Sequence, residues 1–392
     1  MITLFVFFVF LFMAYIERKS IFSSFLFFIF SLSFLATFLL SLYETTYIET
    51  SAVLYLLFFF MPFFICFNRL KMSSRKTLCL SKEIKIFANI FMVFSIPAVL
   101  FYGYYTIQTL LFTDLSNVRN TGEFLLPSNF LNTIFSFFSS LYFVPLLLYF
   151  YFLKEDLMSN KRILLIISSL SFPLLTLCYA GRDGVLFWGM NFVVFYLFFK
   201  DSIENKIELR KIVKIVVIVI LLFLLLFLLI SSARFSDSDE GTFYSIVSYI
   251  GQQTSNFSQR FNNDFFEGKG SLFPGLKSML GISQQTNEDG FYEYRLYGLE
   301  EQYNVFGFFA STIVNGYGKF TAFLIAILFF LIVRHYILLY QKNGSVLDLL
   351  LVVMFFQIPM NGVFYYRQGI GNGDVMYLIL WIMILILKRI KI

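Results

Sequence analysis

Charged residues are scarce in this chain of 392 residues, because Asp, Glu, Lys and Arg together make up only 14% of it. A soluble domain carries about a quarter of its residues as charged side chains. Hydrophobic residues account for 59% of this sequence and aromatic residues for 21%. The balance excludes a water-soluble domain with a single apolar core and predicts a protein dissolved in a lipid bilayer.

Residues that form disulfides or hold metals are also few. The three cysteines, Cys66, Cys79 and Cys178, lie in or beside apolar runs, so we expect no disulfide framework. His335 is the single histidine and no Cys/His cluster exists, which leaves a nitrogen- or sulfur-ligated metal site almost no support. The net charge of +6 comes with no nucleic-acid-binding motif. We therefore expect no cofactor and no nucleic acid partner.

Apolar runs recur from one end of the chain to the other, and most approach the ~20 residues needed to cross a bilayer. The first run follows no basic residue and contains no small-residue cleavage site, so we interpret it as a retained helix. The pattern predicts a single all-α transmembrane domain over 1–392 with about eleven spans. These spans are expected at 2–16, 21–42, 51–67, 86–105, 129–153, 163–180, 184–199, 212–232, 320–340, 346–366 and 375–387.

Most lysines and arginines fall in alternate loops between these spans, and loops rich in them stay cytoplasmic. Eleven spans then predict an N-terminus outside the cytoplasm and a C-terminus inside it. The outer side keeps a minority of the basic residues, namely Arg119, Arg182, Arg234, Arg260, Lys269, Lys277, Arg295, Lys319 and Arg367. The long polar stretch 233–319 is also on the outer side. Within it, TFYSIVSYIGQQTSNFSQRF has apolar residues at roughly helical spacing, which predicts an amphipathic helix at the membrane surface.

The outward arginines are the first candidates for chemistry. Arg182 lies in the turn Gly181-Arg182-Asp183-Gly184 between two apolar runs, and Arg234 directly follows another. A guanidinium at the bilayer edge can hold a diphosphate, because its planar fork matches phosphate oxygens and keeps its charge. Arg260 and Arg295, in the large loop, are candidates for substrate binding. The competing interpretations are anchoring to lipid headgroups for the first pair and a solvated loop face for the second.

Carboxylates close to these arginines in sequence are candidates for a general base. They are Asp183, Asp237, Asp239 and Glu240, and the sequence does not choose among them. Asp237-Ser238-Asp239 also matches the aspartate-any-aspartate pattern with which some glycosyltransferases hold a divalent cation. Three residues are too few to be specific, and a hydrated loop is the favoured interpretation because Glu240 adds a third like charge, so no metal site is assigned.

Tyrosines of the outer loop are candidate platforms for sugar rings. Tyr249, Tyr294 and Tyr297 have flat apolar faces, although aromatic residues also populate membrane-interface belts. Ionisable residues are nearly absent from the predicted spans, with Asp348 as the mild exception. Ion-coupled transporters normally carry such groups at membrane depth, so this scarcity weighs against transport.

Four features occur in a characteristic order: the charged turn 180–184, the arginine after a later helix in Ser232-Ala233-Arg234-Phe235, the loop opening SIVSYIGQQTSNFSQRF, and YNVFGFFASTIVNGYGKFTAFLIAILFFLIVRHY. This layout, over roughly 163–340, resembles that of the Wzy-type O-antigen and capsule repeat-unit polymerases. The family's external arginines would fall on Arg182 and Arg234, and less closely on Arg260. Arg260 reaches Gly270 one residue earlier than the arginine–glycine spacing of some members.

The resemblance implies a metal-independent, inverting glycosyltransferase of the bacterial inner membrane with its site facing the periplasm. Such an enzyme moves a growing glycan from undecaprenyl diphosphate to the non-reducing end of a new lipid-linked repeat unit. The implied partners are these lipid-linked oligosaccharides, the lipid bilayer and a chain-length regulator in the membrane.

Three alternatives stay open at this point. A flippase for the same lipid-linked oligosaccharide predicts charges within its helices and no large external loop. An O-antigen ligase uses similar chemistry with a different acceptor. A non-catalytic membrane scaffold or sensor explains the aromatic loop but not the outward arginines.

Overall fold

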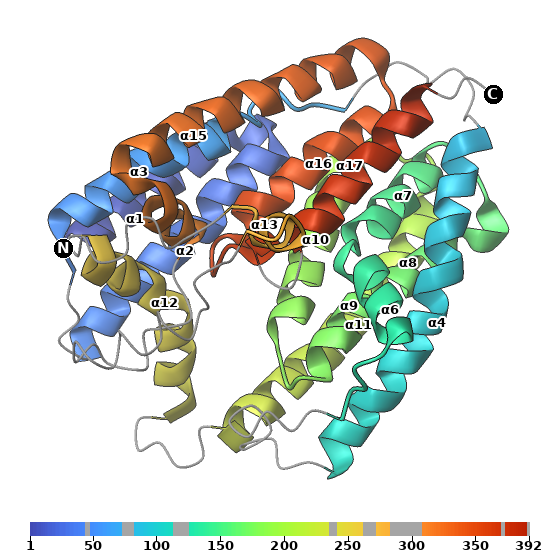
Figure 1. The fold of residues 1–392 in the computed structure, drawn as a ribbon, viewed down its shortest axis with the longest axis horizontal. Coiled ribbons are helices and arrows are strands. Elements are labelled where there is room, and N and C mark those ends of the chain that lie inside the picture. Colours follow the sequence, from blue (N-terminus) through green and yellow to red (C-terminus); the bar gives the residue numbers. More distant parts are fainter. Residues whose placement is uncertain are drawn as a thin grey trace. The chain divides into compact units, whose positions relative to one another are not determined.

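The computed structural model describes residues 1–43, 48–72, 82–112, 125–234, 241–261, 272–282, 308–369 and 373–389, and all regular structure in these ranges is helical (Figure 1). The chain folds into two compact units. Unit 1 combines Met1–Ser73 with Phe243–Lys388, and unit 2 is essentially Ser74–Thr242. Unit 1 is therefore assembled from segments that are distant in sequence.

Unit 1 is a helical bundle formed by the two ends of the chain. Its first part contains α1 (Ile2–Ile16), η1 (Glu17–Lys19), α2 (Ile21–Tyr43) and α3 (Thr50–Ile65). Its second part contains α12 (Gly241–Phe261), α13 (Pro274–Met279), α15 (Phe309–Asn343), α16 (Val346–Asn361), η5 (Arg367–Gly369) and α17 (Gly373–Arg389). The pairs α1–α2, α3–α15 and α15–α16 pack side by side (Figure 1).

Phenylalanine rings join the two parts of unit 1. Phe30 of α2 lies 4.7 Å from Phe60 of α3 and 5.5 Å from Phe308, measured between ring centroids. Phe63 of α3 lies 4.7 Å from Phe309 of α15. All five rings are buried. Lipid tails are as apolar as these side chains, so close van der Waals packing has to hold such helices together.

The helix α15 is broken at Gly318, whose φ of 77° and ψ of 162° leave the helical region. Only glycine adopts this backbone conformation readily. The segment before the break turns in toward α16, where the Phe309 amide donates a 2.9 Å hydrogen bond to the Gly362 carbonyl. The predicted span 320–340 therefore starts at a backbone break and continues to Asn343.

The helix expected within 233–319 is confirmed as α12 (Gly241–Phe261), while its place at the membrane surface on the outer side stays a prediction. It packs closely on α2, because Thr37 Oγ1 donates a 2.8 Å hydrogen bond to the Gly251 carbonyl and Ser33 Oγ a 3.0 Å bond to the Ile250 carbonyl. Its buried residues include Gln253 and other polar side chains as well as apolar ones. The apolar spacing alone did not predict this polar contact with α2.

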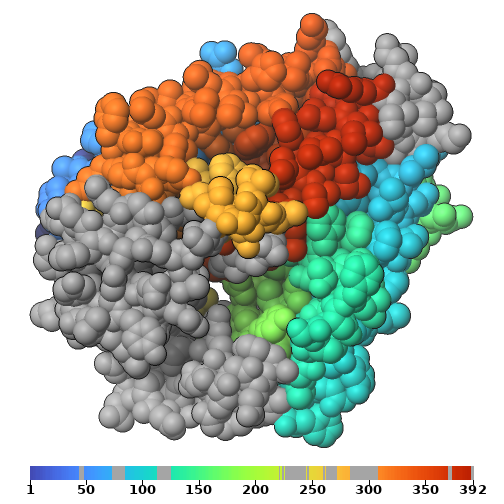
Figure 2. All heavy atoms as spheres, viewed as in Figure 1, coloured from blue at the N-terminus to red at the C-terminus, as the bar shows by residue number. Residues whose placement is uncertain are grey.

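The short helix α13 is fixed to the start of α17 by a carboxylate. Asp374 is 5% exposed, and its two oxygens accept hydrogen bonds from the amides of Gly275 and Leu276 at 3.2 and 3.0 Å. A carboxylate at this position satisfies donors that a helix leaves open in its first turn. Figure 2 shows α13 in yellow-orange against α17 in red.

Unit 2 is built around the long helix α4 (Lys82–Phe112), which packs against its neighbours on several sides. The others are α6 (Phe130–Ser140), α7 (Phe143–Lys154), η2 (Ser159–Lys161), α8 (Arg162–Ser169), α9 (Ser171–Leu177), α10 (Asp183–Phe199) and α11 (Lys206–Arg234). The predicted span 129–153 was expected as one helix and is a bent pair, α6 and α7, whereas the span 163–180 falls on α8 and α9, which lie within one candidate membrane span. Pro145 lies near the start of α7, where a missing amide is tolerated but a continuous helix is not.

All eleven predicted spans fall on helices. Among the described residues, four helices are long and apolar enough to cross a membrane, at Ile21–Tyr43, Ile84–Phe112, Ser159–Leu177 and Phe309–Asn343. The pair α6 and α7, bent by 48°, would make a fifth. Shorter apolar helices are α3, α10 and α16. The structure is thus that of a helical membrane protein, while the number of eleven spans and their orientation stay predictions.

We expect Gly251→Ala to destabilise unit 1, because a Cβ at this position would lie 2.7 Å from the Ala36 carbonyl carbon and 2.8 Å from the Thr37 amide nitrogen. Overpacking against a backbone costs about 1–3 kcal/mol. The measurement is the fraction of detergent-solubilised protein that stays monodisperse after heating. Gly189→Ala in α10 is the matched control, since its Cβ would meet nothing within 4 Å. Equal thermal stability of the two variants would contradict the close α2–α12 contact.

Candidate functional site

The turn between α9 and α10 holds the first two sequence-predicted candidates, Arg182 and Asp183. The Gly181 amide donates a 2.8 Å hydrogen bond to the Thr176 carbonyl, and the Ala180 amide a 2.9 Å bond to the Leu177 carbonyl. Ala180 has a positive φ of 49°. Together these features form a Schellman motif, which ends α9 and reverses the chain. The side chain of Arg182 is thereby placed immediately before the first residue of α10.

Two glycines let the backbones of this turn approach closely. A Cβ at Gly181 would lie 2.9 Å from the Thr176 carbonyl oxygen and 3.2 Å from Asp183 Oδ1. A Cβ at Gly184 would lie 2.2 Å from Thr176 Oγ1. The carboxylate of Asp183 therefore lies over the turn. Both glycines of the Gly-Arg-Asp-Gly sequence are required by contact with Thr176.

The electrostatics of the turn favour an anion. Arg182 is only 7% exposed and is the N-cap residue of α10. The N-terminus of a helix carries a partial positive charge, so a buried guanidinium there adds to a field that already attracts anions. Asp183, half-buried in the first turn, supplies the favourable opposite charge. The turn therefore combines a guanidinium at a helix N-terminus with a neighbouring carboxylate.

Hydroxyl groups of α4 fix the other side of the turn. Thr106 Oγ1 donates to the Leu174 carbonyl at 3.0 Å, and Thr109 Oγ1 donates to the Cys178 carbonyl at 3.3 Å. The Cys178 thiol in turn donates to the Tyr102 carbonyl at 3.3 Å. These bonds tie α4 to the end of α9, and the bond to the Cys178 carbonyl satisfies an acceptor just past the last residue of that helix.

The start of α6 completes the polar surroundings. Tyr102 OH donates a 2.9 Å hydrogen bond to Asn132 Oδ1, and the Asn132 amide nitrogen donates to the Pro127 carbonyl at 3.0 Å. Asn132 also shares a side-chain hydrogen bond with Tyr179 of the turn. Asn129 caps α6 by accepting the backbone N–H of Asn132 at 2.8 Å. Residues of α4, α6 and the α9–α10 turn therefore meet at one end of unit 2.

Basic residues gather at the opposite end of unit 2. Arg162, at the start of α8, lies 3.2 Å from both Asp156 and Glu208, and Lys206 donates to the Lys200 carbonyl at the end of α10. The 17 residues of α10 separate these groups from Arg182 by about 25 Å along the helix axis. That length is close to the ~30 Å thickness of a bilayer core.

The structure places the remaining predicted residues as follows. Arg234 is the last residue of α11 and Arg260 belongs to α12, and their side chains lie outside the description. Tyr249 of α12 is half-buried with its ring centroid 5.7 Å from that of Phe364. Six candidates lie outside the described residues: Asp237, Asp239, Glu240, Tyr294, Arg295 and Tyr297. The structure thus describes the side chains of Arg182 and Asp183 in unit 2, and these two are neighbours in sequence rather than residues that the fold brings together.

Sequence reasoning missed the residues that support this pair. Tyr102, Thr106 and Thr109 are spaced at helical intervals on one face of the otherwise apolar α4. A polar stripe of this spacing inside an apolar helix is a signal for a buried polar contact. Asn132 carried no comparable signal, because its role depends on how α6 meets α4.

Within the described ranges, no group of three or more His, Cys, Asp or Glu side chains could hold a metal ion. The described part of the site consists of a guanidinium, a carboxylate, a phenol, hydroxyls and amides. Such groups bind anions and hydroxylated ligands through hydrogen bonds.

We expect Ala180→Gly to stabilise the protein by about 0.5–1 kcal/mol, because glycine adopts the left-handed conformation without the steric cost that alanine has there. The greater conformational freedom of glycine in the unfolded chain offsets part of this stabilisation. Gly181→Ala should destabilise it by about 1–3 kcal/mol through contact with the Thr176 carbonyl. Fluorescence of Trp188, which is 1% exposed and close to the turn in α10, reports unfolding in a Trp381→Phe background. A lower stability for Ala180→Gly would contradict the motif.

No protein-family model, no curated protein and no solved structure matches this chain. What the site does is therefore inferred from its residues and their geometry.

Proposed function

We propose that the protein is a membrane glycosyltransferase that polymerises oligosaccharide repeat units carried on undecaprenyl diphosphate. The observation that carries this proposal is a buried arginine, Arg182, at the N-terminus of α10 with a carboxylate, Asp183, next to it. An apolar helical protein with an anion-attracting end suits a substrate that is a lipid with a diphosphate headgroup.

Arg182 acts on the leaving group in this proposal. When the bond between the anomeric carbon and the diphosphate oxygen breaks, negative charge grows on the diphosphate. A guanidinium held by burial at a helix N-terminus stabilises that charge without reorganising at the moment of reaction. The planar fork of arginine also orients two phosphate oxygens at once, which a lysine cannot do.

Asp183 is the candidate base among the described residues. The acceptor sugar hydroxyl gives its proton to the carboxylate, and its oxygen attacks the anomeric carbon from the side opposite to the diphosphate. The glycosidic bond forms as the diphosphate leaves, with inversion at the anomeric carbon. Asp237, Asp239 and Glu240, outside the described residues, stay as alternative bases. Arg234, Arg260, Arg295, Tyr294 and Tyr297 stay as proposed substrate-binding residues, together with Tyr249.

The proposal includes the topology that the basic residues predict. Eleven spans would place the α9–α10 turn in the periplasm and the C-terminus in the cytoplasm of a bacterial inner membrane. Supporting this, Lys154, Arg162, Lys200 and Lys206 lie at the ends of unit 2 helices that are remote from Arg182. A chain-length regulator in the same membrane is the proposed protein partner.

Transport is less well supported than transfer. Asp348, the one acidic residue of note in an apolar span, is fully buried and forms an ion pair with Lys388. Asn343 Nδ2 donates a further 3.0 Å hydrogen bond to Asp348 Oδ2. These partners hold the C-terminal ends of α15 and α17 to the start of α16. The carboxylate of Asp348 therefore pairs with side chains that hold helices together and does not face a transported ion.

In a strain deleted for this gene, we expect the wild-type gene to restore a ladder of long surface glycans and Arg182→Ala to fail. Removing one preorganised charge of this kind lowers the rate by ~10²–10³-fold. Arg182→Lys should retain part of the activity, and Asp183→Asn should abolish it if Asp183 is the base. Gel separation of the extracted glycans measures the chain lengths.

Arg210→Ala is the matched control, because Arg210 is an exposed arginine of the same unit. All variants are compared at equal protein levels by blotting. A deletion strain with no repeat units at its surface would favour the flippase or ligase instead. An unchanged ladder in the deletion strain would contradict the polymerase.

A further inference from the structure

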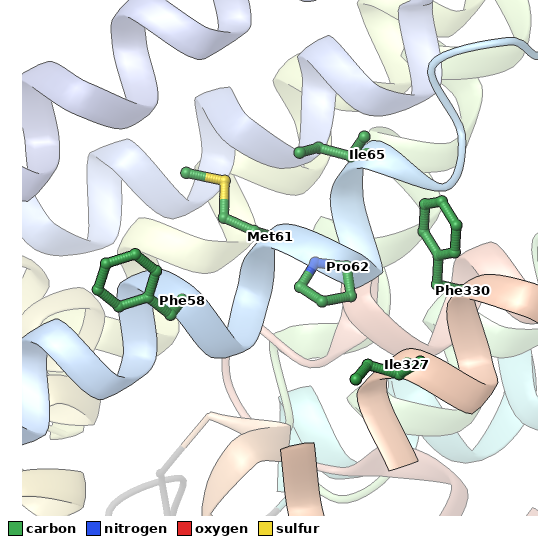
Figure 3. A pocket seen from close by; sticks show the side chains of 6 residues that line it. All are labelled: Phe58, Met61, Pro62, Ile65, Ile327 and Phe330. Atoms are coloured by element: carbon green, nitrogen blue, oxygen red, sulfur yellow. The ribbon is translucent and has the colours of Figure 1, made fainter. Parts of the chain in front are cut away.

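An apolar groove runs between α3 and α15 on unit 1, whereas the site described above belongs to unit 2. It has a volume of about 340 Å³ and is lined by Phe58, Met61, Pro62, Ile65, Ile327 and Phe330 (Figure 3). The lining residues of α3 recur at helical spacing and lie on one face of that helix. The side chain of Phe58 is 59% exposed and that of Ile327 is 44% exposed, so the groove opens at the surface of the bundle.

Pro62, inside α3, is one of the residues that line the groove. Proline has no amide hydrogen, so α3 lacks one backbone hydrogen bond at this position. In Figure 3 the Pro62 ring faces α15, with Phe58 one turn before it and Ile65 after it. An open groove lined by apolar side chains, the thioether of Met61 among them, is suited to a flexible hydrocarbon chain.

Two arginines lie beyond one end of the groove. Arg334 follows Phe330 by one helical turn, with its guanidinium carbon 5.4 Å from the Phe330 ring centroid. Arg69 follows Ile65 by the same interval in the turn after α3, and its carbonyl accepts a hydrogen bond from Gln341 Nε2. Since α3 and α15 run in the same direction here, both arginines occur at the same end.

The charge at this end is net positive and not fully satisfied. Arg334 interacts electrostatically with Arg69 as a like charge, and Glu17 of η1 offsets part of that charge. Nη1 of Arg334 is buried and has no hydrogen-bond partner among the described residues. A buried donor of this kind is costly unless a ligand or water pairs with it.

We propose that this groove and its two arginines form a binding site for an anionic phospholipid, with an acyl chain against Pro62 and Ile327 and the phosphate beside Arg334. The apolar walls match the chain, and the positive end matches the headgroup. A zwitterionic lipid would bring an additional positive charge toward Arg334 and Arg69. The site is independent of the polymerase reaction, and under the topology proposed above it lies at the cytoplasmic side.

The test is native mass spectrometry of the purified full-length protein with phosphatidylglycerol and phosphatidylcholine of matched chains. We expect about fivefold more phosphatidylglycerol retained, since one basic residue near an anionic headgroup contributes on the order of 1 kcal/mol. Arg334→Gln should remove this preference. Ile327→Trp, which fills the groove, should lower retention of phosphatidylglycerol while both arginines remain.

Lys319→Gln is the matched control, because Lys319 is a cation of α15 remote from the groove, with its ammonium 4.1 Å from the Phe261 ring centroid. It should keep the wild-type preference. If Arg334→Gln cannot be purified, Arg69→Gln tests the same charge. Equal retention of both lipids by the wild type would overturn the site. Displacement of phosphatidylglycerol by excess inorganic phosphate would also overturn it, because that result indicates an anion site without a groove that binds the acyl chain.

Discussion

The carbonyl oxygen of Thr176 accepts hydrogen bonds from the Tyr179 and Gly181 amides, at 3.0 and 2.8 Å, and the geometry of the candidate site depends on it. These bonds end α9 and return the chain into α10 within a few residues. Because the turn is so tight, Gly181 and Gly184 pass directly against Thr176. The one position in the turn with a long basic side chain, Arg182, is consequently buried at the start of α10.

Burial of a cation at a helix N-terminus is unfavourable by itself, since the guanidinium loses water and faces the positive end of the helix. Such an arrangement persists where the surroundings fix it, and strained or destabilised groups concentrate at functional sites. Here hydroxyls of α4 and Asn132 of α6 hold the turn from the other side. In unit 1 another buried charge is also fixed by its surroundings, because Asp348 of α16 forms an ion pair with Lys388 of α17.

Much of the fold could be predicted from hydropathy, since every predicted span lies on a helix, several with bounds within one or two residues. The bent pair within 129–153 was missed because hydropathy does not register a bend near Pro145. The assembly of unit 1 from both ends of the chain could not be predicted from the sequence, because it depends on ring contacts such as that of Phe63 with Phe309. Arg182 and Asp183 were found from their unusual charge. The helical spacing of Thr106 and Thr109 in α4 was a usable signal that was missed, whereas Asn132 acts through a contact that no local pattern specifies.

The most direct measurement uses the purified protein in liposomes with a synthetic undecaprenyl-diphosphate-linked repeat unit, followed by separation of the lipid-linked products by chain length. We expect products longer than a single repeat unit from the wild type. Arg182→Ala should give none while its Trp188 fluorescence shows a folded unit 2. Failure of the wild type to extend the substrate, or equal extension by Arg182→Ala, would contradict a role for the buried arginine in glycan transfer.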